Sequence, residues 1–515
     1  MAKFIHLTSM LDVILTAEQI KKADAYTIKH EPIASIDLME RASKACVSWI
    51  EKNIQGKRSF KVFCGTGNNG GDGLAICRLL LEKGHEVQPF IIRHNKKMST
   101  DASRNEARLM QKDISLVRNI YQINDLAPIE SNDIVIDALF GIGLNKEVKG
   151  LAAHVIDYIN ESMAEVIGID MPSGMLADHP SQHFQSIIKA DHTLSFQTYK
   201  QAFLYNENQY WLGDIHLLNI GLDQSYLQSL DRTHRFYDHT FCLSKLRHRD
   251  SFSHKGNFGH ALLIAGQKGM MGAAILSAKA AMRSGLGLCT AYLPGIGLPV
   301  MHSTVPEVIC MASEKENYIS GLPDLKKYKA IAIGPGIGND DKTVQTLSDL
   351  LSISPVPLII DADAINLLAT HQELFPKIPE LSVLTPHPKE FDRLCGKSSS
   401  DFERNEKQIA FAQAHKVYVL IKGKNSCIAC PDGTCYINTS GNAGMATAGT
   451  GDVLSGILLA LMAQGYTPND AVLMAVNIHG LAGDFALEEK GMHAMMAGDL
   501  IDQLPVVFKS LENIR

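Results

Sequence analysis

Short, almost continuously apolar runs alternate along this chain with longer runs in which apolar residues recur three or four positions apart. A strand that is buried on both faces of a sheet needs the first pattern, and a helix that covers the sheet needs the second. Most of the short runs end in polar or glycine-containing segments. The order of the two patterns predicts α/β domains with doubly wound parallel sheets.

The first half begins with helical patterns. Thr16 and Gln19 form a capping box for one helix, and a second helix is predicted around residues 38–49. A third pattern, over residues 74–82, follows the glycine-rich loop that begins at Asn68. Strands are predicted at residues 60–64, 87–92, 134–138, 166–169 and 192–196.

The second half repeats the arrangement. Strands are predicted at residues 260–266, 331–333, 358–360, 382–384 and 418–421, and an apolar helix at residues 453–462. Residues 417–420 and 426–429 are interpreted as a strand pair, with a turn at Pro431. A histidine- and arginine-rich stretch at residues 231–255 is interpreted as a polar connector. We therefore place the domain boundary between residues 235 and 236.

Polar side chains gather where the predicted strands of the first half end. Since ligands of parallel sheets bind at the carboxyl ends of strands, we expect a site there. Asn69, Asp137 and Ser173 offer hard oxygen ligands with one negative charge, which suits a monovalent cation. Asp170 has the chemistry of a proton acceptor or donor. The alternative is that these side chains only cap helices and turns.

A second set of loops predicts an anion site in the second half. Residues 441–456 crowd glycine ahead of Asp452 and a predicted helix, so backbone N–H groups and the helix start would attract phosphate. Asp452 could then accept a proton from an attacking hydroxyl. The alternative is a glycine-rich turn before a core helix. For His387, the alternative to a binding role is a turn histidine between two prolines.

Composition narrows the class of protein. The chain has 515 residues, 45% of them hydrophobic and 20% charged, which predicts two to four domains. Its net charge of −6 argues against nucleic acid and acidic membrane surfaces as partners, and we see no apolar run of the roughly 18 residues that a membrane span needs. Ten scattered cysteines indicate a reducing cytoplasm. Cys427 and Cys430 form a lone CxxC, interpreted as sheet side chains rather than a metal site.

Together the motifs resemble those of the bifunctional NAD(P)H-hydrate repair enzymes, in which an epimerase half is fused to an ADP- or ATP-dependent dehydratase half. The resemblance spans nearly the whole chain. The motifs of the first half are NNGGDG, DALFG, GxGL and DxPSG, and those of the second half are HKGxxG, GMxGAA, GPGxG, DADAxN, LTPHP, KGxxS and GNxGMATxGTGD. The resemblance implies two three-layer αβα domains, a Rossmann-like one at residues 1–235 and a ribokinase-like one at residues 236–515.

The resemblance also implies an activity. The first domain would interconvert the R and S forms of hydrated NADH and NADPH (NADHX and NADPHX). The second would return the S form to NAD(P)H, with ADP or ATP as co-substrate and release of phosphate. Potassium in the first domain and magnesium are the implied ions. A homo-oligomer is compatible with the sequence, which does not decide between ADP and ATP or between NADHX and NADPHX.

Residue roles follow from the same resemblance. Asp170 and Asp452 would be catalytic, and Asn69, Asp137 and Ser173 would bind potassium. The hydrate in the first domain would contact Asn68, Asn69, Gly70, Gly71, Asp72, Gly141, Ile142, Gly143, Leu144, Asn145, Lys146, Glu147 and Asp170. The hydrate in the second would contact Ala273, Gly336, Gly338, His387 and Asp452. The nucleotide would contact Lys422, Gly423, Lys424, Asn425, Ser426 and Gly451.

One alternative function stays open. Many ribokinase-like proteins phosphorylate a small molecule and stop there, and domains that resemble the first half also occur as non-catalytic scaffolds. The chain could therefore be a small-molecule kinase fused to a non-catalytic binding domain. Retention of Asn69, Asp137, Asp170 and Ser173 as a set favours catalysis, since a scaffold needs no such set.

Overall fold

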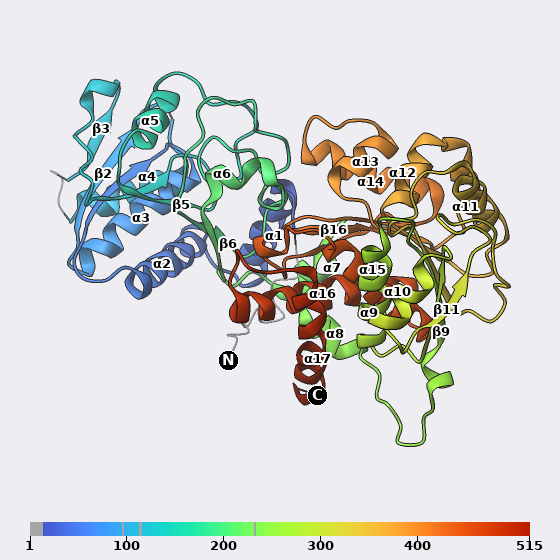
Figure 1. Cartoon of the computed structure of the whole chain (residues 1–515). Helices are drawn as coiled ribbons and strands as arrows, with labels where there is room; N and C mark the ends of the chain where they lie inside the picture. The colour runs from blue at the N-terminus through green and yellow to red at the C-terminus, as the bar shows by residue number, and fades with distance from the viewer. Residues whose placement is uncertain (1–13, 95–96, 113–115, 231–232, 515) are drawn as a thin grey trace. The chain divides into compact units, whose positions relative to one another are not determined.

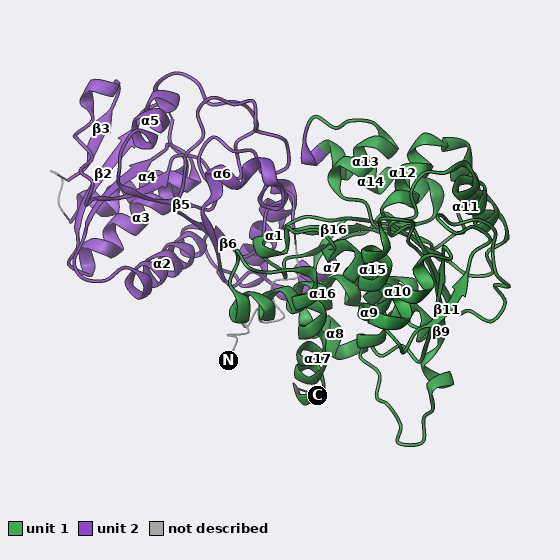
Figure 2. Ribbon diagram, viewed as in Figure 1, with its two compact units in different colours: residues 1–5, 233–399, 403–515 green, residues 6–232, 400–402 purple. Residues whose placement is uncertain are grey.

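The computed structural model describes residues 14–94, 97–112, 116–230 and 233–514. They form two compact units (Figures 1 and 2). The N-terminal unit comprises the described residues up to 230, with residues 400–402 grouped with it. The C-terminal unit comprises residues 233–399 and the described residues from 403 onward.

The N-terminal unit is built around one seven-stranded sheet. Its strands are β1 (Ser59–Cys64), β2 (Glu86–Ile92), β3 (Arg118–Ile120), β4 (Ile134–Ala138), β5 (Glu165–Ile169), β6 (His192–Phe196) and β7 (Asp214–Leu218). Its α-helices are α1 (Ala17–His30), α2 (Ser35–Asn53), α3 (Asn68–Glu82), α4 (Thr100–Met110), α5 (Leu151–Asn160), α6 (Gln209–Leu212) and α7 (Gln224–Ser229).

All neighbours in this sheet are parallel, in the order β3-β2-β1-β4-β5-β6-β7. Alternate residues of β1 enter opposite cores: Val62 packs with residues of α2 and α3, and Phe63 packs with residues of α5. The order in which the strands are added to the sheet reverses between β1 and β4. At such a point a parallel sheet has a crevice at the carboxyl ends of its strands. The predicted three-layer αβα class is confirmed for this unit.

The C-terminal unit contains a ten-stranded sheet in the order β11-β10-β9-β12-β13-β14-β15-β16-β17-β8. Its strands are β8 (His234–Phe236), β9 (His260–Ile264), β10 (Leu288–Leu293), β11 (Ile309–Ala312), β12 (Ala330–Ile333), β13 (Leu358–Ile360), β14 (Val383–Leu384), β15 (Tyr418–Ile421), β16 (Ser426–Ala429) and β17 (Cys435–Asn438). Its α-helices are α8 (His239–Lys245), α9 (Met271–Arg283), α10 (Gly297–Thr304), α11 (Asp341–Ile353), α12 (Asp363–Thr370), α13 (Pro388–Cys395), α14 (Asp401–His415), α15 (Thr450–Ala463), α16 (Pro468–Lys490) and α17 (Ala497–Ile514).

Helices cover both faces of this sheet as well. Leu263 of β9 belongs to the core that contains α9, α15 and α16, whereas Leu262 belongs to the core that contains α11 and α12. Only the pairings of β15 with β16 and of β16 with β17 are antiparallel. The turn at Pro431 therefore joins β16 to β17, one strand later than the predicted pair.

Two further predictions about local structure are corrected. The stretch expected to be a connector contains β8 and α8, and β8 pairs with β17, so the C-terminal sheet begins before residue 236. Helix α3 begins at Asn68 rather than near residue 74. Its glycines allow close packing: a Cβ on Gly70 would lie 1.9 Å from the carbonyl oxygen of Gly65, and one on Gly73 would lie 2.6 Å from the Cβ of Ala138.

One helix among those described, α16, is long and apolar enough to cross a membrane by length and composition. The sequence analysis overlooked it. In the structure 67% of its apolar window is buried inside the unit, where Val472, Ala475 and Ile478 join the same core as α15. Helix α16 therefore has the surroundings of a core helix in a unit whose sheet is covered by helices on both faces.

The contact of α15 with α9 depends on a small residue. A Cβ on Gly456 would lie 2.2 Å from the carbonyl oxygen of Ser277 and 2.8 Å from the Cβ of Ala280. We predict that Gly456→Ala lowers the free energy of unfolding by about 1–3 kcal/mol, since the helices must move apart. Calorimetric melting checks this. Gly498→Ala is the control, because a Cβ there has no atom within 4 Å, and an equal loss in both variants would contradict the explanation.

Candidate functional site

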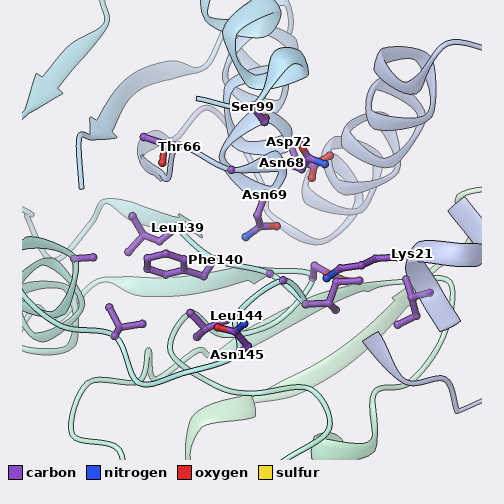
Figure 3. A pocket seen from close by; sticks show the side chains of 18 of the residues that line it. Lys21, Thr66, Asn68, Asn69, Asp72, Ser99, Leu139, Phe140, Leu144 and Asn145 are labelled. Carbon is purple, nitrogen blue, oxygen red and sulfur yellow. The ribbon is translucent and has the colours of Figure 1, made fainter. Parts of the chain in front are cut away.

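A cavity of about 1150 Å³ lies where the N-terminal sheet was expected to bind a ligand. Figure 3 shows it from close by, with Asn68, Asn69 and Asp72 on one side and Leu144 and Asn145 on the other. Residues of α1, of the start of α3, of the loop after β4 and of the ends of β5 and β6 contribute to its wall. Its volume is at the upper end of the range typical of small-molecule sites.

The loop after β4 forms a large part of the cavity wall. The seven residues predicted to hold a substrate all line the cavity: Gly141, Ile142, Gly143, Leu144, Asn145, Lys146 and Glu147. Gly70 and Gly71 were predicted to do so too, but they are not among the lining residues. They pack inside the unit, since a Cβ on Gly71 would meet the side chain of Met39 at 2.9 Å.

Asp170 lines the cavity directly after β5 and is only 7% exposed. Its φ of +66° lies in the left-handed region, which is costly for a residue with a Cβ and is often found at functional positions. Lys200 Nζ lies 2.6 Å from Asp170 Oδ1 and 2.6 Å from the hydroxyl oxygen of Ser195. Lys200 is 0% exposed, so only the carboxylate of this ion pair reaches the cavity.

Sequence reasoning missed Lys200. It follows β6 by only a few residues, so the rule that predicted Asp170, a polar residue beyond a strand end, also applied to it. A lysine is rarely buried without a partner, but the sequence did not reveal its burial. The structure makes it the counter-charge of Asp170.

Asp137 and Ser173 lie together, and neither is among the residues that line the cavity. The Ser173 hydroxyl donates to Asp137 Oδ1 at 2.6 Å, and the Ser173 N–H donates to Asp137 Oδ2 at 2.8 Å. Burial raises the pKa of Asp137 to about 6, against these hydrogen bonds. Asn69 reaches the cavity from α3, and among the described residues its buried Nδ2 has no hydrogen-bond partner.

The C-terminal unit carries a second carboxylate–lysine pair, at the ends of the two strands that flank β14. Asp361 directly follows β13 and is 1% exposed, and Lys422 directly follows β15. Lys422 Nζ lies 2.9 Å from Asp361 Oδ1, and the Ser455 hydroxyl donates to Asp361 Oδ2 at 2.5 Å. Although burial opposes ionisation, Lys422 and Ser455 lower the pKa of Asp361. Neither Asp361 nor Ser455 had been assigned a role from the sequence.

The start of α15 lies beside this pair. Gly449, with φ +90°, precedes the helix, and no side chain caps its first N–H groups. A Cβ on Gly451 would lie 3.2 Å from Lys422 Nζ, so the helix start and the lysine face one space. Burial, then the charges of Asp361 and Asp363, raise the pKa of Asp452 to about 7, although Lys422 lowers it. The arrangement combines an anion-binding helix start with a proton acceptor that titrates near neutrality.

The other predicted residues of the second half fall into two groups. Ala273 and Gly336 are neighbours, since a Cβ on Gly336 would lie 3.3 Å from that of Ala273, and the Gly338 N–H donates to Asp363. His387 instead caps α13: its Nδ1 accepts from the N–H groups of residues 389 and 390. The alternative stated for His387 was a turn histidine between two prolines, and its contact with the hydrate stays a prediction.

The loop after β15 continues with Gly423, Lys424, Asn425 and Ser426. The Ser426 hydroxyl donates to the Gly423 carbonyl oxygen at 3.1 Å, which closes the turn before β16. Of the two cysteines predicted to be sheet side chains, Cys427 lies on β16, whereas Cys430 directly follows that strand, and both are unbridged. Within the described ranges no cluster of His, Cys, Asp or Glu suits a metal ion.

We predict that Lys200→Met lowers the free energy of unfolding of the N-terminal unit by about 3–5 kcal/mol, because it leaves the Asp170 carboxylate buried without its counter-charge. Trp49 and Trp211, the two tryptophans of the chain, belong to this unit, so denaturant titration of tryptophan fluorescence reports on it.

The control is the double variant Lys200→Met with Asp170→Asn, in which the buried charge is removed as well. It should recover much of the lost stability. If the double variant were as unstable as the sum of the two single variants, the pair would not be coupled.

Comparisons with known proteins also divide the chain into an N-terminal and a C-terminal part. A family model described as NAD(P)H-hydrate dehydratase matches residues 261–506, and one described as YjeF-related protein N-terminus matches residues 35–202. The bifunctional NAD(P)H-hydrate repair enzyme Nnr of Moorella thermoacetica is 37% identical, covering 97% of both chains. Its counterpart in Escherichia coli K12 is 30% identical, covering 95% of this chain and 92% of the relative.

Among solved structures, the ADP/ATP-dependent NAD(P)H-hydrate dehydratase of Bacillus subtilis, co-crystallised with ATP and Mg²⁺, is 33% identical. The match covers 54% of this chain and 98% of that chain, with a TM-score of 0.48.

Proposed function

The chain belongs to the family of bifunctional NAD(P)H-hydrate repair enzymes, and on that premise we propose how its two units divide the work. The N-terminal unit interconverts the R and S hydrates of NADH and NADPH. The C-terminal unit converts the S hydrate to NAD(P)H with ADP or ATP. The observation that carries this division is that each unit has its own carboxylate–lysine pair, with a buried carboxylate, at the ends of its parallel strands.

The N-terminal cavity suits a hydrated dinucleotide. The start of α3 offers free N–H groups to a pyrophosphate at the point where the strand order reverses. Asp170 is fixed by Lys200 and by its own N–H, which donates to the Leu194 carbonyl oxygen at 2.8 Å. A carboxylate held in this way can exchange a proton with the oxygen bound to the reacting ring carbon without moving.

In the C-terminal unit the difficulty is the leaving group. Hydroxide leaves poorly, so the ring hydroxyl first attacks the terminal phosphorus of the nucleotide, whose P–O bond breaks to release AMP from ADP or ADP from ATP. Phosphate then leaves with the electrons of its C–O bond while the ring nitrogen supplies its lone pair. Loss of a proton from the adjacent ring carbon forms the C=C bond of NAD(P)H and returns the lone pair to nitrogen. Asp452 accepts the hydroxyl proton. Lys422 and the first N–H groups of α15 hold the phosphoryl oxygens. Asp361 keeps Lys422 in place and charged.

The residues proposed for potassium fit such an ion. Asp137 is 0% exposed, and in the described chain its carboxylate has hydrogen-bond donors but no cationic partner. Asn69 and Ser173 would add neutral oxygens. A monovalent cation there would neutralise the buried charge and hold the loop after β4 in place. Magnesium would accompany the nucleotide in the C-terminal unit, where Asp361, Asp363 and Asp452 supply negative charge.

The ten unbridged cysteines support a reducing, cytoplasmic location for the protein. We also propose that its partners are small molecules alone, with neither nucleic acid nor membrane among them, since the net charge of −6 supplies no field to attract polyanions.

The first test is the recovery of reduced-nicotinamide absorbance from a mixture of R and S hydrates with magnesium and either ADP or ATP. Complete recovery supports both activities. Recovery that stops at the S fraction would contradict the epimerase activity and leave the dehydratase activity supported. No recovery with either nucleotide, together with a stable phosphorylated product from another small molecule, would favour the kinase alternative.

Two substitutions should separate the activities. We predict that Asp452→Asn slows dehydration of the S hydrate by about 10²–10⁴-fold and spares epimerisation, whereas Asp170→Asn has the reverse effect, because each removes one proton acceptor from one site. Conversion of pure R and pure S hydrate is measured for each variant. Loss of both activities in either folded variant would contradict the division into two sites.

The dehydration rate should depend on pH through Asp452. The residue acts as a base only when ionised, and its pKa is raised to about 7. Therefore kcat/KM for the S hydrate rises with pH through about 7 and then levels off. Initial rates between about pH 5 and pH 9, at saturating nucleotide and magnesium, test this. A rate that is independent of pH below 7 would show that Asp452 is not the base.

A further inference from the structure

The cavity of the N-terminal unit contains a carboxylate with no assigned role, Asp24 of α1. Ile20 and Asp24 both line the cavity and lie one helical turn apart, so they share a face of the helix. The neighbouring positions Ala23 and Thr27 are fully buried. Asp24 thus lies at the edge of the buried face of α1, where an acidic side chain is costly unless it serves a purpose.

Asp24 lacks the partners that would make it a structural residue. In the described chain no side chain or backbone group forms a hydrogen bond or ion pair with its carboxylate, whereas Asp170 is held by Lys200 at 2.6 Å. The charged groups that face Asp24 are Asp72, Asp170 and Lys200, with Lys21 on its own helix. Three carboxylates therefore share a single enclosed lysine.

This shortage of positive charge favours a bound proton. Burial first, and then the charge of Asp170, raise the pKa of Asp24 to about 6, although Lys200 lowers it. Burial and the charges of Asp170 and Asp24 raise the pKa of Asp72 as well. Asp170 is paired with the ammonium group of Lys200, and Asp24 is not. An acid and a base that act in one site need different environments of this kind.

Resting on the proposed function, we infer that Asp24 is the second proton-transferring residue of the epimerase site, acting on the face of the nicotinamide ring opposite to Asp170. Inversion at one carbon needs a group on each face. Asp24 donates a proton to the ring hydroxyl, the C–O bond breaks, and its electrons leave with the departing water. The lone pair of the ring nitrogen forms the C=N bond of an iminium ion.

Water then adds from the other face. Its oxygen forms the new C–O bond, the C=N electrons return to nitrogen, and Asp170 accepts the proton that water releases. One proton has moved from Asp24 to Asp170, and the reverse reaction or the solvent returns it. No oxidant or reductant is needed, and the hydroxyl oxygen is replaced by one from solvent at each inversion.

The test uses the full-length chain with pure R hydrate. Asp24→Asn is compared with Glu18→Gln, which makes the same carboxylate-to-amide change on α1 at an exposed residue outside the cavity. Epimerisation is followed by adding an excess of the Asp170→Asn chain, which consumes the S hydrate as it forms. We expect Asp24→Asn to lower kcat by about 10²-fold or more and to change KM by less than about threefold.

Two readouts separate proton transfer from a structural role. In the wild type, kcat/KM for epimerisation falls as pH rises through about 6, because Asp24 loses its proton, and Asp24→Asn lacks this limb. In ¹⁸O-labelled water, each inverted molecule gains one labelled oxygen. Dehydration of the S hydrate and the melting temperature stay at the wild-type values in Asp24→Asn.

Each contrary result has a distinct meaning. If Asp24→Asn epimerised as fast as Glu18→Gln, or if its loss were wholly in KM, the inference would be overturned. Inversion without labelled oxygen would overturn the elimination–addition route and with it the role of Asp24. If the wild type itself left the R hydrate unchanged, the proposed function would fail instead.

Discussion

The free-energy cost of burying charge governs both sites of this protein. Asp170 and Asp361 directly follow central strands, in positions where a carboxylate loses most of its hydration. One lysine lies within 3 Å of each and offsets part of this cost: Lys200 in the N-terminal unit and Lys422 in the C-terminal unit. Such pairs stabilise little by themselves, but breaking one leaves an isolated charge at a cost of several kcal/mol. The pairs therefore fix the geometry around which the remaining groups act.

The same interaction assigns different chemistry to neighbouring carboxylates. Once a lysine is paired with one acid, burial and repulsion outweigh its attraction for the second acid of the site, so the pKa of that second acid rises, as it does for Asp24 and Asp452. Both units thus place a paired carboxylate beside an unpaired one. This arrangement provides a group that can exchange protons near neutral pH without any change in the fold.

Much of this architecture could be predicted from the sequence. Strands β1, β4, β6, β13 and β15 were predicted nearly residue for residue, and β13 and β15 are continuously apolar because both of their faces are buried. Edge strands such as β3 and β11 were missed, since they are short and partly exposed. The start of α3 was taken for a loop because glycine disfavours helix in isolation, whereas here it permits contact with the backbone of Gly65 that no other residue allows.

Site residues could be predicted from the sequence where the residue type and its position after an apolar segment were enough. They could not be predicted where their role depends on a second residue far away in the sequence. Asp170 and Asp452 stand out as acids beyond apolar segments, but Lys200 acquires meaning only when β6 lies beside β5, and Asp24 only when α1 faces the cavity. Which side chains meet at the ends of the strands depends on the order of the strands in the sheet, and the pattern of residues along the chain does not give that order. The capping of α13 by His387 has the same origin: Nδ1 of its ring accepts from the N–H groups at the helix start, an arrangement that depends on the geometry of residues 387–390.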